Sequence, residues 1–156
     1  MQRLRVYVDT SVFGGVRDEE FADASRRFFR RACNGDFTVL LSLHTIEELL
    51  PAPPEVRRVL QDLPPEWVET VETGEEVEAL AQAYIDAGAL AEGARLDSLH
   101  VAAATVARAD LILSWNFRHI VRYDRIRMFN GVNTLRGYHP LDIRSPLEVG
   151  DEDQDV

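Results

Sequence analysis

Short, nearly continuous runs of apolar residues recur along the chain and predict buried β-strands. Four such runs are clear, at residues 4–8, 37–42, 67–71 and 111–114, and a weaker one lies at 141–144. Most are rich in leucine and β-branched residues, as is usual for the strands of a parallel sheet covered on both faces. We therefore expect these runs to form one buried sheet.

The segments between these runs carry apolar residues at helical spacing. They predict helices at residues 19–33, 45–50, 55–62, 74–88, 97–109 and 117–122. Glycine or proline residues follow several of these segments, as expected where helices end. Strands that alternate with helices favour an α/β fold, in which helices cover both faces of a mostly parallel sheet.

The length and composition fit a single domain. The 156 residues, 46% of them hydrophobic, are enough for one core, and we expect the domain to span 1–149. The segment 150–156 has four acidic residues and no apolar pattern, which predicts a disordered tail. Cys33 is the only cysteine, so neither an intramolecular disulfide nor a cysteine zinc cluster can form. No signal peptide or apolar run of ~20 residues is present, and we expect a cytoplasmic protein without membrane contact.

The charged residues exclude several kinds of chemistry. All 17 basic residues are arginine, so the chain lacks the lysine that a phosphate-binding P-loop or a Schiff-base enzyme requires. The formal net charge of −10 argues against indiscriminate nucleic-acid binding. Net charge does not describe the local field, however, since eight arginines are concentrated in the segments 26–31 and 118–127.

Four polar residues follow the predicted strands or lie on the helices after them: Asp9, Glu48, Asp97 and Asn116. Each has an ordinary interpretation. Asp9, Asp97 and Asn116 could cap the segments that follow them, and Glu48 could be a solvated helix residue beside Glu47. Sites in parallel sheets, however, collect at the carboxyl ends of the strands. We therefore expect these four side chains to converge at one edge of the sheet.

Converging carboxylates repel one another unless a cation neutralises them. Oxygen ligands alone suit Mg²⁺ or Mn²⁺, and such an ion supports phosphodiester hydrolysis. The four histidines lack the close spacing of a zinc site. His100 lies three residues after Asp97 and could contact the site, but we interpret it as a packing residue. The sequence thus predicts a magnesium or manganese site.

Four segments in order carry a resemblance to a known family. They are VYVDTSV at 6–12, SLHTIEEL at 42–49, RLDSLHVAAA at 95–104 and ADLILSWNFRHI at 109–120. With these segments the chain resembles the PIN-domain ribonucleases, especially the VapC-type toxins of bacterial toxin–antitoxin pairs. The segment FNGVNTLRGYHPLDIRSPLEV at 129–149 is similar to the end of one PIN subgroup. The resemblance covers nearly the whole chain up to the acidic tail.

The resemblance implies a three-layer α/β/α sandwich on a mostly parallel five-stranded sheet. It also implies that Asp9, Glu48 and Asp97 are the first three acids of the site and bind Mg²⁺ or Mn²⁺. Glu48 matches the second acid better than Glu47, because it lies six residues after Ser42 and precedes Leu49.

Asn116 stands at a fourth position that is usually aspartate in the family, which lowers the charge of the site by one. The resemblance further implies a role for a hydroxyl near the first acid, to which Thr10 or Ser11 corresponds. Ser114, at the end of the fourth predicted strand, is a further supporting candidate.

The leading expectation is a metal-dependent endoribonuclease, with Asp9, Glu48, Asp97 and Asn116 as its catalytic residues. It would act on single-stranded or looped RNA. The resemblance implies a toxin inhibited by a cognate antitoxin protein, and also a homodimer. The alternative is a non-catalytic PIN-fold module that binds RNA or a protein, which Asn116 favours. A small-molecule phosphatase is a weaker interpretation, since Ser11 interrupts the D-x-D pattern of haloacid-dehalogenase-type enzymes.

Overall fold

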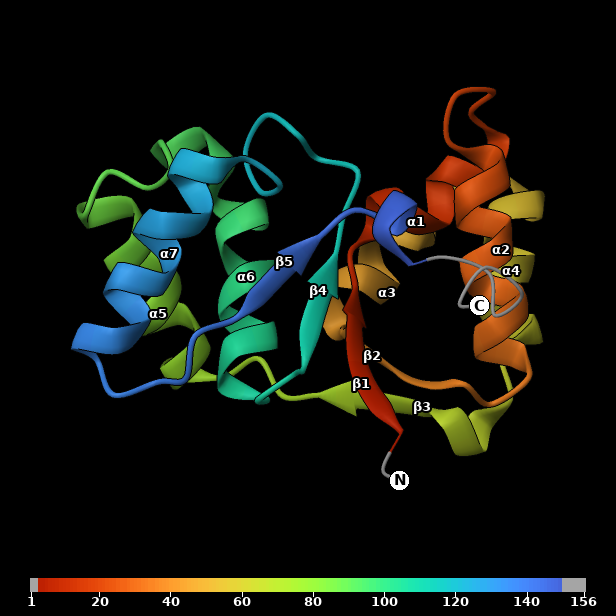
Figure 1. Ribbon diagram of the computed structural model, residues 1–156, viewed down its shortest axis with the longest axis horizontal. Helices are drawn as coiled ribbons and strands as arrows, with labels where there is room; N and C mark the ends of the chain where they lie inside the picture. Colours follow the sequence, from red (N-terminus) through yellow and green to blue (C-terminus); the bar gives the residue numbers. More distant parts are fainter. Residues whose placement is uncertain (1–2, 150–156) are drawn as a thin grey trace.

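A five-stranded parallel sheet forms the centre of the molecule (Figure 1). The computed structural model describes residues 3–149. The order of the strands across the sheet is β3-β2-β1-β4-β5, and all four pairings are parallel. The strands are β1 Leu4–Val8, β2 Phe37–Ser42, β3 Val68–Val71, β4 Leu111–Leu113 and β5 Asp142–Arg144. All five strands predicted from the apolar runs are therefore confirmed, to within a residue at their ends.

Helices connect the strands along the described part of the chain. The α-helices are α1 Thr10–Gly14, α2 Ala22–Cys33, α3 Leu43–Leu49, α4 Pro54–Asp62, α5 Glu75–Asp86, α6 Arg95–Val106 and α7 Tyr123–Leu135. Short 3₁₀ turns are formed by η1 Gly15–Arg17, η2 Pro65–Trp67, η3 Glu92–Ala94 and η4 Pro146–Glu148. None of the helices within 3–149 is long and apolar enough to cross a membrane.

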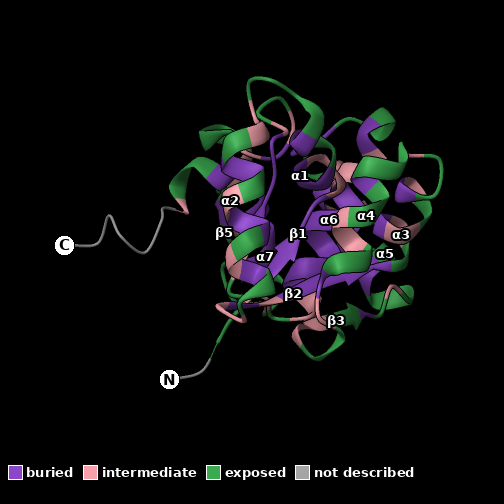
Figure 2. Cartoon of the chain, turned by 90° about the vertical axis from the view of Figure 1, so that its right-hand side faces the viewer, coloured by how far each residue is buried: buried purple, intermediate pink, exposed green. Residues whose placement is uncertain are grey.

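Two hydrophobic cores lie on opposite faces of the sheet. Helices α5, α6 and α7 pack on one face, and α1, α2 and α4 pack on the other, as Figure 1 shows. Successive residues of β1 point to opposite faces of the sheet. Tyr7 therefore packs in the core beneath α5, α6 and α7, while Val6 and Val8 pack in the core beneath α1, α2 and α4. In Figure 2 the buried residues are concentrated in the strands and on the sides of the helices that face them. The predicted three-layer α/β/α sandwich is therefore confirmed.

The region after β4 differs from the prediction. The helix expected at 117–122 is a turn, because the Asn116 carbonyl accepts hydrogen bonds from both Ile120 N and Val121 N, at 3.0 and 2.8 Å. Arg122 is then extended, and the helix α7 begins one residue later. The sequence did not predict α7, which buries only Phe129, Val132 and Asn133 and so has a weak apolar pattern.

Several helix starts also differ from the prediction: α2 begins at Ala22, three residues later than expected, and α3 begins at Leu43, two residues earlier. Helix α1 begins directly after Asp9 and was not predicted, because it is only five residues long. Helix α6 begins at Arg95, two residues earlier than expected, and Ala94 takes its N-cap position. Asp97 is therefore a first-turn residue of α6 and not its cap. The predicted tail at 150–156 lies outside the described residues.

Candidate functional site

Asp9 lies where β1 meets α1, and it is almost completely buried. It takes the N-cap position of α1, but its side chain makes no capping hydrogen bond. Instead, its Oδ2 accepts hydrogen bonds from the hydroxyls of Ser11 and Ser114, each at 2.7 Å. The N–H of Asp9 donates to the carbonyl of Leu113 at 3.0 Å, which brings the ends of β1 and β4 together. The two predicted serines therefore hold the first predicted acid.

Glu48 approaches the same position from α3. Ser42 and Thr45 form a capping box at the start of this helix, which fixes its register. Glu48 is partly buried, and its Oε1 lies 2.6 Å from His100 Nε2, whereas Glu47 is exposed. Burial opposes the charged form of Glu48, but the hydrogen bond and positive charge of His100 outweigh it and lower the pKa of Glu48.

His100 lies close to both Asp9 and Glu48. Its Nε2 lies 3.7 Å from Asp9 Oδ1, and its Nδ1 lies 2.7 Å from the hydroxyl of Tyr7, which is 2.8 Å from Ser42 Oγ. Burial favours the neutral ring, yet the carboxylates of Glu48 and Asp9 outweigh it and raise the pKa of His100. The interpretation of His100 as a packing residue is therefore incomplete. It is fully buried, and it also contacts the acids directly.

Asp97 faces the site from the first turn of α6. Its Oδ2 lies 2.9 Å from Nδ1 of His119, a residue in the turn after β4. Burial raises the pKa of Asp97, and the negative charge of Asp9 adds to the shift. His119 was not predicted as a site residue. No spacing in the sequence shows that this turn folds back onto α6.

Asn116 has the ordinary role that the sequence left open, except that it stabilises a turn and not a helix. Its side-chain Oδ1 accepts a hydrogen bond from His119 N at 2.8 Å. Its backbone N–H donates to Ser114 Oγ at 2.9 Å, the hydroxyl that donates to Asp9. Asn116 thus fixes both His119 and Ser114.

The donor set has the chemistry that a magnesium or manganese ion requires, but it is not preassembled. Among residues 3–149, no three His, Cys, Asp or Glu side chains are grouped so that they could hold one ion. Histidine nitrogens contact Glu48 Oε1 and Asp97 Oδ2, so an ion would bind the other oxygen of each carboxylate or displace these contacts. Thr10 Oγ1 is buried and directed toward Glu48, where it helps to lower the pKa of that carboxyl, but it makes no hydrogen bond of ordinary geometry within the described chain. A ligand bound beside Glu48 could take up this hydroxyl.

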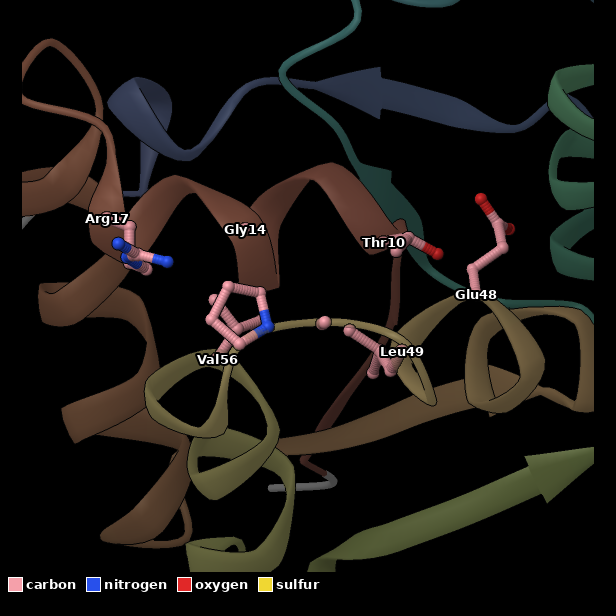
Figure 3. Close-up of a pocket in the computed structure, with 8 residues that line it drawn as sticks. Thr10, Gly14, Arg17, Glu48, Leu49 and Val56 are labelled. Carbon is pink, nitrogen blue, oxygen red and sulfur yellow. The ribbon is translucent and has the colours of Figure 1, made fainter.

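A cavity of about 310 Å³ opens beside these residues (Figure 3). Figure 3 shows the hydroxyl of Thr10 and the carboxylate of Glu48 at one end of the cavity and the guanidinium of Arg17 at the other. The side chains of Leu49 and Val56 line the side between them. The cavity therefore leads from the guanidinium of Arg17 to the carboxylate of Glu48.

No protein-family model matches the chain, and no curated protein matches it either.

Proposed function

We propose that this protein is a metal-dependent endoribonuclease of the PIN-domain kind, and the toxin of a toxin–antitoxin pair. The observation that carries the proposal is the position of Asp9, Glu48 and Asp97 around one edge of a parallel sheet. Such an edge is where α/β folds bind their ligands. The charge of Asp9 raises the pKa of Asp97, which indicates that these two acids interact electrostatically.

In this proposal Asp9, Glu48 and Asp97 hold a Mg²⁺ or Mn²⁺ ion. When bound, the ion polarises a phosphoryl oxygen of RNA and lowers the pKa of a water molecule. Ser11 and Ser114 keep the Asp9 carboxylate oriented by donating to its Oδ2. The second oxygen, Oδ1, takes no hydrogen bond from these serines and faces His100. Thr10, whose hydroxyl is directed toward Glu48, would add that hydroxyl to the ligands of the ion or of the water.

The remaining residues of the site hold the acids before an ion arrives. His100 pairs with Glu48, and His119 pairs with Asp97, so neither acid faces its neighbours without a partner. Arg17, at the far end of the cavity, would contact an RNA phosphate. The cognate antitoxin would be the partner protein that inhibits the enzyme.

The experiment measures cleavage of a fluorescent single-stranded RNA with Mn²⁺, with Mg²⁺ and with EDTA. We expect cleavage with either ion and none with EDTA. Glu48→Gln should lower the rate more than about 100-fold, since replacing groups that merely hold a metal ligand already costs about 10–100-fold. Glu47→Gln is the matched control and should be nearly unchanged, because Glu47 is exposed and Glu48 makes the contact with His100.

A second function is favoured by the pairing of Glu48 and Asp97 with histidines and by the use of Asn116 in a turn. The protein could be a module of the same fold that binds RNA or a protein without cleavage. The same experiment separates the two. No cleavage with either ion, or equal cleavage by Glu48→Gln prepared in the same way, would rule out the nuclease.

A further inference from the structure

Three aromatic residues form a cluster next to Ser11, the residue whose hydroxyl donates to Asp9. We name this cluster the aromatic platform: Phe21, Trp115 and Phe117. The rings of Phe21 and Trp115 are stacked, with centroids 4.2 Å apart and planes 15° from parallel. The ring of Phe117 lies across both, with centroids 6.1 Å from Trp115 and 6.3 Å from Phe21. Trp115 is buried, whereas Phe117 is 45% exposed. The platform thus has one buried ring, Trp115, one partly buried ring, Phe21, and one exposed ring, Phe117.

Trp115 is held rigidly at its backbone and at its ring. Its backbone N–H donates to Ser11 Oγ, and its indole Nε1 donates to Ser25 Oγ, both at 2.9 Å. Gly15 lies so close that an added Cβ would stand 2.7 Å from Nε1 and 2.6 Å from Ser25 Oγ. Glycine is therefore required for Trp115 to occupy this position. A rigid base reduces the entropy that the exposed ring would lose on binding a ligand.

The side chain of Ser11 contacts both the platform and Asp9. Ser11 Oγ accepts the hydrogen bond from Trp115 N and donates its own hydrogen to Asp9 Oδ2. A cavity of about 370 Å³ lies beside the platform. Ser11, Asn116 and the two stacked rings, Phe21 and Trp115, line it, whereas Phe117 does not. A group bound against the platform would therefore lie next to Asp9.

We propose that the platform binds a nucleobase of single-stranded RNA, which stacks on the ring of Phe117. This inference rests on the proposed function and names how that site holds its substrate. Aromatic side chains stack bases of any sequence, because every base has a π-face. The formal charge of −10 makes such a contact more necessary here, since a chain with this charge gains less from attraction to phosphates. The stacked base would fix the neighbouring phosphodiester near Asp9.

The test measures binding of short single-stranded RNAs in EDTA, where no metal-dependent cleavage occurs. Each RNA carries the fluorescent base 2-aminopurine at one position, and stacking on an aromatic ring quenches its emission. We expect strong quenching at one position. Phe117→Leu keeps an apolar side chain but removes the ring, so it should weaken binding about 5- to 150-fold and abolish that quenching. Phe117→Tyr should restore both.

Tyr123→Ala is the matched control, because Tyr123 is an exposed aromatic residue outside the platform. It should bind RNA like the unmodified protein, and the melting temperature of Phe117→Leu should be unchanged. Equal binding by Phe117→Leu and the unmodified protein, or no RNA binding in EDTA, would overturn the platform. Cleavage with Mn²⁺ would still support the nuclease in that case. Stacking through Phe117 without cleavage would instead support the platform and remove the nuclease.

Discussion

At the scale of single residues, the hydroxyl of Ser114 orients the carboxylate of Asp9. It is fully buried, donates to Asp9 Oδ2 and accepts from Asn116 N. Ser114→Ala should lower the free energy of unfolding by about 1.5–3 kcal/mol, the usual value of a hydrogen bond to a charged group. Ser98→Ala is the control, since Ser98 is equally buried but donates to the neutral carbonyl of Ala81, and it should cost about 0.5–1.5 kcal/mol. Urea unfolding measures both, and a greater loss in Ser98→Ala would contradict this role.

At the same scale, the sequence predicted the carboxylates, and the two serines that hold Asp9, better than the histidines that pair with the other acids. The end of an apolar strand indicated Asp9, and the family resemblance favoured Glu48 over Glu47. A contact of His100 with the site was only the alternative to a packing role, and the contact of His119 was not predicted. A histidine three residues after Asp97 is compatible with packing as well as with contact. Only the packing of α6 against the sheet brings that ring to Glu48.

At the scale of elements, the end of α6 contains a local strain that a substitution can test. Arg108 follows the helix with a φ of 57°, which costs a residue with a side chain about 1–2 kcal/mol. Glycine avoids this cost but loses about 0.5–1 kcal/mol through the freedom of its unfolded backbone. Arg108→Gly should therefore raise the free energy of unfolding by about 0.5 kcal/mol, measured by urea unfolding. A loss of stability would show that the arginine side chain makes a stabilising contact.

The elements themselves were predictable where their apolar pattern was strong. The central strands β1, β2 and β4 are short and mostly buried on both faces, so their residues stand out in the sequence. Helix α7 was not predicted, because most of its residues are exposed and its buried Asn133 is polar. That amide bonds to Tyr84, a contact between α5 and α7 that no local pattern indicates.

At the scale of the whole molecule, alkaline pH should destabilise the protein through its buried tyrosines. Burial raises the pKa of Tyr7 and of Tyr84 well above the ordinary value of about 10. The folded protein therefore keeps these protons at a pH where the unfolded chain loses them. The associated stability is complete below pH ~10 and is lost as the pH rises towards the folded pKa, by up to about 1.4 kcal/mol per pH unit for each tyrosine.

Urea unfolding between pH 8 and pH ~11.5 measures this loss, and tyrosinate absorbance follows the ionisation. Tyr84→Phe should make the fall in stability less steep, because Tyr7 is then the only one of the two deeply buried tyrosines that remains. The chain has no lysine, so no lysine ammonium group titrates over the same range. An unchanged slope in Tyr84→Phe would show that Tyr84 ionises equally in the folded and unfolded states.

Because β1 lies in the middle of the sheet, its pairing with both neighbouring strands can be completed only late in the synthesis of the chain. β1 lies between β2 and β4, and Asp9 and its partner Ser114 are 105 positions apart. At about 5–20 residues per second, a ribosome needs roughly 5–20 s to make that interval. Until β4 emerges, one edge of β1 has no neighbour, and an unpaired edge invites association with other chains. This edge of β1 therefore stays unpaired at least until residue 114 has been made.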